Sequence, residues 1–232
     1  MCLMFIAAPT TAAAAEVFNF TTGTPASGTN WSFNSGTGWL TVNAGANVVV
    51  TGTTANGGIF ASGAGNRTIT LRNVDITHSF DRPLNIFANT TIILEGTNFL
   101  RQTGTGMDRG SGIFVNTGQT LTINGDGALI ANSVEGDGIS NGNNATINVN
   151  GGTVIATGNS SHPSFNGIRN ATGSTFNNIG GNVFANSVQN DGIITGNTIH
   201  TYRFTTHPND ESKFTGETAT FSFEEQGNLA PT

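Results

Sequence analysis

One phrase recurs along this chain at a nearly constant spacing. Its clearest copy is GSGIFVNTGQTLTINGDGALIANS at residues 110–133, and an early copy, WLTVNAGANVVVTG, begins at Trp39. The other copies are each anchored by an isoleucine, and these are Ile59, Ile86, Ile113, Ile139, Ile168 and Ile193. Repetition at a period of roughly 27 residues indicates a stack of supersecondary units, each in contact with its neighbours.

Within each copy the apolar residues alternate with polar ones. Ile69 and Leu71 are two residues apart, as are Leu121 and Ile123, so both members of each pair lie on one face of a strand. The 32 Gly, 36 Thr and 30 Asn among 232 residues disfavour helix and favour strands joined by turns. One coil cannot bury its apolar residues alone, so the pattern predicts an all-β parallel β-helix of about six to seven coils with irregular caps.

Two phrases, GSGIFVNTGQTLTINGDGALIA and ATINVNGGTVIATG, carry a family resemblance. They resemble the repeats of bacterial secreted and cell-surface right-handed parallel β-helix proteins of the pectate-lyase-like superfamily. The resemblance covers about residues 39 to 200. It implies a right-handed β-helix in an extracellular carbohydrate setting. That superfamily includes polysaccharide lyases, glycoside hydrolases, adhesins, sugar-binding modules and spacers, so the resemblance does not choose among these activities.

Both ends of the chain depart from the repeat. The opening MCLMFIAAPTTAAAAEV is typical of the later part of a secretory signal, with cleavage after Ala15 and loss of Cys2, although an apolar N-terminal strand is the alternative. No stretch reaches the roughly 18 apolar residues of a membrane helix. We therefore expect a secreted or cell-surface protein, divided into a signal remnant at 1–15, an N-terminal cap at 16–38, a β-helix at 39–200, and a C-terminal cap or the start of a truncated further domain at 201–232.

Charge narrows the possible partners. The formal net charge is −6, and the chain has eight Lys and Arg residues together. Phosphate backbones need basic patches, so nucleic acid is excluded as an expected partner. A polysaccharide or a host or cell-surface glycan is the partner that we expect, and no cofactor fingerprint is present.

Acidic residues recur at the repeat period and are the candidates for catalysis. Asp81-Arg82 and Asp108-Arg109 are one repeat period apart, each pair beginning five positions before an anchoring isoleucine, and Glu135 follows one period later. Stacked on successive coils, these carboxylates would lie about 5 or 10 Å apart, which spans the separations that glycoside hydrolysis uses. A polysaccharide lyase would use carboxylates for Ca²⁺ and Arg82 or Arg109 as the proton acceptor.

A structural explanation competes with this catalytic row. Asp and Arg are ordinary residues at polar corners, where they form surface ion pairs worth at most about 1 kcal/mol. His78 could complete an acid–base group beside Asp81, or it could be a corner residue. The GDG sequences around Asp126 and Asp137 suggest Ca²⁺, but neither continues as a nine-residue calcium-binding repeat, and turn formation is the favoured interpretation. No residue spacing defines a metal site.

Aromatic residues provide another route to sugars. Trp31, Trp39 and Tyr202 are the only Trp and Tyr residues, and exposed rings could stack on pyranose faces. Capping the solenoid end is an equal alternative for Trp31 and Trp39. The phenylalanines of the recurring IF, which are Phe60, Phe87 and Phe114, are expected in the core or against a corner.

The main hypothesis is therefore an adhesive, carbohydrate-binding or structural module, followed by a polysaccharide lyase or glycoside hydrolase. Ice binding is third, because flat rows of Thr on solenoids can perform it. Thr68-Ile69-Thr70 has the right local shape, but its equivalent Thr91-Ile92-Ile93 breaks the grid. An enzyme should bring carboxylates together in a groove, whereas a module should present a flat Asn and Thr face.

Overall fold

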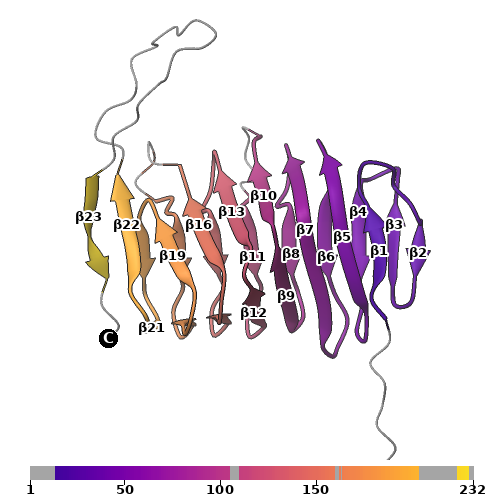
Figure 1. The fold of residues 1–232 in the computed structure, drawn as a ribbon. Coiled ribbons are helices and arrows are strands. Elements are labelled where there is room, and N and C mark those ends of the chain that lie inside the picture. Colours follow the sequence, from indigo (N-terminus) through magenta and orange to yellow (C-terminus); the bar gives the residue numbers. More distant parts are fainter. Residues whose placement is uncertain (1–13, 105–109, 160–161, 163, 204–223, 230–232) are drawn as a thin grey trace, which may run out of the picture.

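The chain folds into a right-handed parallel β-helix, described here from a computed structural model. The structure describes residues 14–104, 110–159, 162, 164–203 and 224–229. Figure 1 shows the strands stacked along one axis, from the N-terminal strands at one end to β22 and β23 at the other. The described residues contain strands and turns but no helix, which confirms the predicted fold class.

Each coil contributes one strand to a sheet that we call face 1. In the described residues seven strands run parallel on this face, so the solenoid has seven coils. They are β4 (Trp39–Val42), β6 (Gly58–Ala61), β8 (Leu84–Ile86), β11 (Ile113–Val115), β14 (Ile139–Asn141), β17 (Ile168–Asn170) and β20 (Val188–Asn190).

The remaining strands form two further sides, faces 2 and 3. The long strands β5 (Asn47–Thr54) and β7 (Arg67–His78) pass through both sides. Face 2 continues with β9 (Thr90–Glu95), β12 (Thr120–Gly125), β15 (Thr146–Val149), β18 (Thr175–Asn178) and β21 (Ile193–Gly196). Face 3 continues with β10 (Thr97–Gln102), β13 (Ala128–Ser133), β16 (Thr153–Thr157), β19 (Asn182–Ala185) and β22 (Ile199–Arg203).

The corner between faces 2 and 3 explains the recurring glycines of the repeat. Successive coils place a residue with positive φ at this bend, as Asn73 does at 51° and Gly125 at 98°. Gly and Asn adopt this conformation at lower cost than other residues. The chain therefore turns sharply at an equivalent point in these coils, whereas the bend between β18 and β19 has no residue with positive φ.

The register along face 1 differs from the sequence alignment in two places. Ile113 pairs with Leu84, so the equivalent of Ile86 is Val115. Ile193 is not on face 1, because Val188 pairs with Ile168 there and Ile193 pairs with Thr175 on face 2. The expected equivalences of Ile86 with Ile113 and of Ile193 with Ile168 are therefore wrong.

A shift of two residues is invisible to the hydrophobic pattern. Leu84 and Ile86 are both fully buried, so either could occupy the position that Ile113 occupies in the next coil. Only a one-residue slip would move the apolar side chains to the wrong side of the strand. Coil lengths therefore vary, and the coil that runs from Ile59 to Leu84 is shorter than the one that runs from Leu84 to Ile113.

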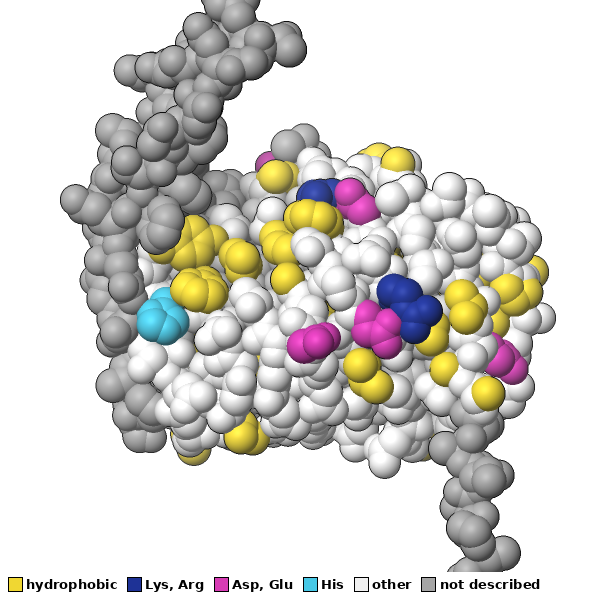
Figure 2. All heavy atoms as spheres, viewed as in Figure 1, with side chains coloured by type: hydrophobic (Ala, Val, Ile, Leu, Met, Phe, Trp, Pro, Cys, Tyr) yellow, Lys and Arg dark blue, Asp and Glu magenta, His cyan; other side chains and the backbone are white. Residues whose placement is uncertain are grey.

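The outer surface carries little charge. Figure 2 shows a mostly uncharged face with a few separate acidic and basic side chains. In the described part of the chain, ion pairs join Arg72 to Glu95 and Arg101 to Asp75.

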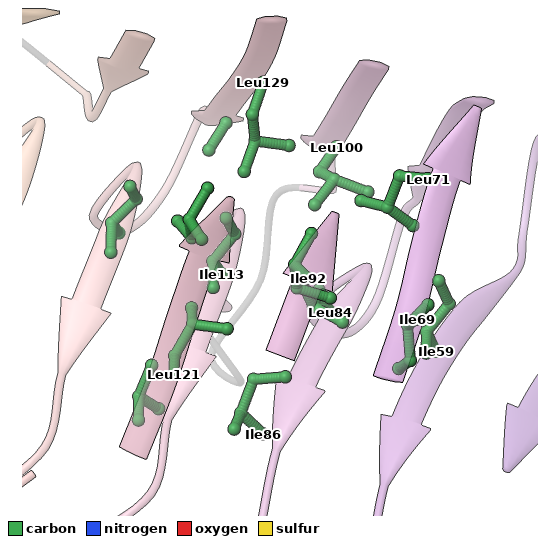
Figure 3. Close-up of a cluster of buried hydrophobic side chains, with 14 of the residues drawn as sticks. Ile59, Ile69, Leu71, Leu84, Ile86, Ile92, Leu100, Ile113, Leu121 and Leu129 are labelled. Carbon is green, nitrogen blue, oxygen red and sulfur yellow. The ribbon is translucent and has the colours of Figure 1, made fainter. Parts of the chain in front are cut away.

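The core fills the space between the three faces. Figure 3 shows Ile and Leu side chains from successive coils meeting inside the solenoid. Alternation along the strands supplies them: in β12, Leu121 and Ile123 are fully buried and the residues between and beside them are partly exposed. The apolar side chains stack on their equivalents in neighbouring coils, which is why no single coil is stable alone.

Buried asparagines form a ladder at the ends of the face 1 strands. Asn141 donates from Nδ2 to Oδ1 of Asn170 at 2.8 Å, and Asn170 donates in the same way to Asn190 at 2.8 Å. Asn141 and Asn170 are fully buried. The two hydrogen bonds link three successive coils, and Oδ1 of Asn141, at the start of the ladder, has no hydrogen-bond partner among the described residues.

The N-terminal end is closed by an aromatic plug. β1 (Glu16–Asn19) pairs with β5. β3 (Trp31–Asn34) pairs antiparallel with β4, and β2 (Ser27–Gly28) pairs antiparallel with β3, which extends face 1. Phe18, Phe20 and Trp31 are buried in this plug. The predicted signal segment lies outside the described residues up to residue 13.

At the C-terminal end, β23 (Glu224–Leu229) pairs antiparallel with β22 and covers the last strand of face 3. Residues 204–223 and 230–232 lie outside the described residues. In the described residues, the antiparallel pairings at the two ends differ from the parallel pairing of the regular coils.

Candidate functional site: an aromatic row on face 1

Four aromatic rings from successive coils form a row on the outside of face 1. They are Trp39, Phe60, Phe87 and Phe114, and we call them the aromatic row. Ring centroids are 6.5 Å apart for Trp39 and Phe60, 5.1 Å for Phe60 and Phe87, and 5.9 Å for Phe87 and Phe114. The row is continuous over four coils, from β4 to β11.

Alternation explains why these rings point outward. Ile59 and Ile113 are fully buried, so the residue after each of them, Phe60 or Phe114, lies on the outer side. Phe87 is 38% exposed. Of the two positions expected for these phenylalanines, in the core or against a corner, the core is therefore wrong for all three.

The two-residue shift at β8 does not interrupt the row. Asn85 occupies the register position between Phe60 and Phe114, but only 3% of it is exposed, and its Nδ2 donates to the Arg82 carbonyl at 3.1 Å. Phe87, two residues further on, supplies the ring that contacts both neighbours. The aromatic surface is thus continuous although the register is not.

Trp39 lies at the N-terminal end of the row, over a glycine. A Cβ on Gly58 would lie 2.4 Å from Cζ3 of the indole, so only glycine allows the ring to lie flat there. The ring also packs against the imidazole of His78, with centroids 5.2 Å apart. Trp39 and His78, both candidates from the sequence, are therefore neighbours.

His78 organises the corner that leads into β8. Its Nδ1 accepts hydrogen bonds from the backbone N–H groups of Phe80, at 3.1 Å, and Asp81, at 2.9 Å. An Nδ1 that accepts carries no proton, so the imidazole is neutral. Burial lowers the pKa of His78, and the negative charge of Asp81 opposes this effect. The contacts identify His78 as the residue that shapes the corner.

The lowered pKa of His78 predicts a loss of stability in mild acid. The unfolded histidine, with its ordinary pKa of 6.5, takes up a proton before the folded one does. Stability therefore falls as pH decreases below about 6.5, where the unfolded state binds more protons. When the pH is lowered from about 7.5 to about 5.5, the thermal midpoint should fall less in His78→Gln than in the natural chain. Equal slopes in His78→Gln and in the natural chain would refute the assignment.

The same corner presents one more ring and a cation. Phe80 is 79% exposed. Oδ1 of Asp81 accepts the backbone N–H of Arg82 at 2.7 Å, and the Arg82 guanidinium carbon lies 4.4 Å from the centre of the Phe114 ring. Arg82 therefore bounds the far end of the aromatic row by a cation–π contact.

The proposed carboxylate row is not in step with the coils. Asp81, Asp108 and Glu135 precede the paired residues Leu84, Ile113 and Ile139 by three, five and four positions. Asp81 and Glu135 lie at the corners before β8 and β14, which are separated by β11. Asp108 and Arg109 lie outside the described residues. Equal spacing in sequence therefore does not place Asp81 and Glu135 at equivalent points of their coils.

The two GDG sequences have turn functions. Asp126 is exposed between β12 and β13. Asp137 is only 7% exposed, accepts the backbone N–H of Asn166 at 2.9 Å, and has a pKa raised by burial. In the described part of the chain, no three His, Cys, Asp or Glu residues gather as metal ligands would.

The other two aromatic candidates are not in the row. Trp31 is 3% exposed in the N-terminal plug, where its Nε1 donates to Oε2 of Glu16 at 2.6 Å. Tyr202 lies on face 3, and its hydroxyl is 2.8 Å from that of Thr157. Burial raises the pKa of Tyr202. Trp31 therefore offers no open stacking surface, and Tyr202 lies on a different face from the aromatic row.

Face 2 presents a polar row instead of an aromatic one. In register across its strands lie outward residues that are all Asn or Thr, namely Asn47, Thr68, Thr91, Thr122, Asn148, Asn177 and Thr195. The adjacent row contains Thr70, Ile93 and Asn124 at equivalent positions, so a two-row Thr grid is absent there. Ice binding stays a prediction with one polar row in its favour.

Comparison with known proteins leaves the family open: no family model, no curated protein and no solved structure matches this chain. Within the described residues, no helix has the length and apolar character needed to cross a membrane. The geometry of the aromatic row is therefore the basis for proposing a function.

Proposed function

We propose that this protein is an extracellular β-helix module that binds glycans along the aromatic row of face 1. The observation that carries the proposal is the row of outward rings on successive coils, bounded by His78 at one end and Arg82 at the other. Contiguous apolar surface on a soluble protein marks interaction sites. Phe87 and the highly exposed Phe80 give this surface open aromatic area.

The spacing of the row suits a linear sugar chain. Strands of neighbouring coils lie about 4.8 Å apart, which is close to the length of one pyranose residue in a polysaccharide. A ring on each coil therefore offers repeated apolar contact to the C–H faces of successive sugars. The partly exposed Thr41 and the mainly uncharged rim provide neutral hydrogen-bonding groups rather than charge.

We favour binding over hydrolysis or elimination because the candidate catalytic groups His78 and Asp81 accept hydrogen bonds from the backbone. His78 uses Nδ1 to accept two backbone N–H groups, and Asp81 accepts the N–H of Arg82. These contacts hold a corner. A polysaccharide lyase or glycoside hydrolase is the alternative proposal, and the release of sugar ends distinguishes it from binding.

The first test is affinity for a panel of neutral and charged polysaccharides, measured by affinity electrophoresis. For a polysaccharide that retards the natural chain, Phe87→Ala should weaken binding by roughly fivefold, because one lost aromatic contact is worth about 1 kcal/mol. Phe114→Ala should have a similar effect.

The matched control is Phe184→Ala. Phe184 is also a partly exposed phenylalanine on an outer face, stacked on His200 with centroids 5.2 Å apart, but it lies on face 3. It should leave glycan binding unchanged. Equal loss in Phe87→Ala and Phe184→Ala would refute the assignment to face 1, and release of new reducing or unsaturated ends would support the enzyme.

A further inference from the structure

A second apolar row lies on the outside of face 3. Phe99, Ile130, Ile155 and Phe184 pair in register across β10, β13, β16 and β19. Each is partly exposed, and its neighbours along the strand are buried and point inward. We call these four residues the apolar stripe.

The stripe ends in a different polar group on each side. Asp75 on β7 pairs with Phe99, and His200 on β22 pairs with Phe184. Figure 2 shows this arrangement as hydrophobic side chains between the histidine and a neighbouring basic and acidic pair. The pair is Arg101 with Asp75, and the Arg101 guanidinium carbon lies 4.2 Å from the centre of the Phe99 ring.

Mostly polar residues flank the stripe along its length. One flanking row consists of Thr97, Ala128, Thr153 and Asn182, and the other includes Arg101, Asn132 and Thr157. An apolar centre with a polar rim is the anatomy of a protein–protein interface. The narrow stripe is therefore bounded on every side.

The order of residues across the coils is nearly palindromic. From β7 to β22 it is Asp75, Phe99, Ile130, Ile155, Phe184 and His200, so the sequence of side chains is the same from either end except for its polar termini. Isologous interfaces require a surface that is complementary to itself. We propose that face 3 binds a second copy of this chain, with the two solenoids antiparallel.

The two-fold axis of this dimer would lie in the interface between Ile130 and Ile155. It would run along the strand direction and so be perpendicular to the stripe. Phe99 of one copy then faces Phe184 of the other, and Ile130 faces Ile155. The carboxylate of Asp75 faces the imidazole of His200 at both ends. A parallel dimer would instead place Asp75 opposite Asp75, which like-charge repulsion disfavours.

The area of face 3 determines how strongly the two copies are expected to associate. The six strands from β7 to β22 extend over about 24 Å, and about five residues of each strand span about 16 Å. The buried area is thus on the order of 400 Å² per copy, at the small end of protein contacts. We therefore expect a weak, reversible dimer that forms at high protein concentration.

Sedimentation velocity of the full chain over a concentration series tests the proposal. The weight-average sedimentation coefficient should rise with concentration for the natural chain. Ile155→Lys places two cations near the axis, each against an apolar residue, and should keep the chain monomeric. Ile130→Glu should do the same. Phe87→Lys on face 1 is the matched control and should still dimerise.

The double variant Ile130→Glu/Ile155→Lys determines the orientation. In the antiparallel dimer each new acid faces the new base of the other copy, so association should return. In a parallel dimer acid would face acid and base would face base. Failure of the double variant to associate would overturn the proposal, as would a natural chain that stays monomeric or Ile155→Lys that still dimerises.

Folding of each variant is checked by circular dichroism and thermal midpoint. Ile155→Thr, which keeps the β-branched shape, serves if Ile155→Lys does not fold, and it should weaken association. This test is independent of glycan binding, because the aromatic row and the apolar stripe lie on different faces. Loss of one function in a variant therefore leaves the other measurable.

Discussion

A Gly138→Val variant is expected to lose at least about 4 kcal/mol of unfolding free energy, the largest effect of any single change proposed here. Gly138 precedes β14 at the corner between faces 3 and 1. A Cβ there would lie 2.5 Å from the backbone N of Thr157 and 2.8 Å from the carbonyl oxygens of Ala131 and Gly167. All three atoms belong to paired backbone, so relief would require breaking strand pairing. Denaturant unfolding followed by circular dichroism measures the loss.

Gly118→Ala is the control for this substitution. Gly118 has a φ of 71°, but no atom lies within 4 Å of its Cβ position. It should therefore lose only the cost of the left-handed conformation, about 1–2 kcal/mol. If Gly138→Val costs no more than Gly118→Ala, close packing at the corner is not what requires glycine.

Asn170→Ala is expected to lose about 3 kcal/mol, because it removes four hydrogen bonds from a fully buried position. The Asn170 amide donates to Asn190 Oδ1 at 2.8 Å and to the Ile193 carbonyl at 3.1 Å. Its Oδ1 accepts from Asn141 at 2.8 Å and from the Ser174 hydroxyl at 2.7 Å. Water cannot easily replace these partners inside the solenoid. The midpoint of urea unfolding, with the slope unchanged, measures the effect.

Asn143→Ala is the matched control. Asn143 is exposed in the turn that follows β14, and β14 pairs with the strand that contains Asn170. It should alter stability by less than about 0.5 kcal/mol. A loss below about 1 kcal/mol in Asn170→Ala would show that the ladder is dispensable. Comparing the two variants separates the effect of removing an asparagine from an exposed turn from the effect of removing buried hydrogen bonds.

The coil architecture could be predicted from sequence because it depends on local alternation. Ile69 and Leu71 mark an inward face without reference to any other coil, and the repeat period shows that such faces stack. The register could not be predicted at β8, where Leu84 and Ile86 are equally buried. The pairing there is decided by corner lengths, which the hydrophobic pattern does not contain.

The candidate site was only partly predictable for a related reason. Trp39 and His78 were singled out separately, but their contact depends on the pairing of β5 and β7 and the path of the corner that follows. The outward direction of Phe60 and Phe114 was available in the sequence, because each follows a core isoleucine in a strand. The general expectation that large apolar residues are buried favoured an inward direction instead.

The three-sided coil has a consequence for how such a chain can change. Each coil adds one position to the outward rows of all three faces, and the paired residues Ile113 and Ile139 mark the start of one unit and the start of the next. Duplication of a unit by recombination would lengthen all three outer surfaces by about 4.8 Å at once. A point mutation at an outward position alters one surface only. Reach and chemical specificity can therefore evolve through separate kinds of genetic event.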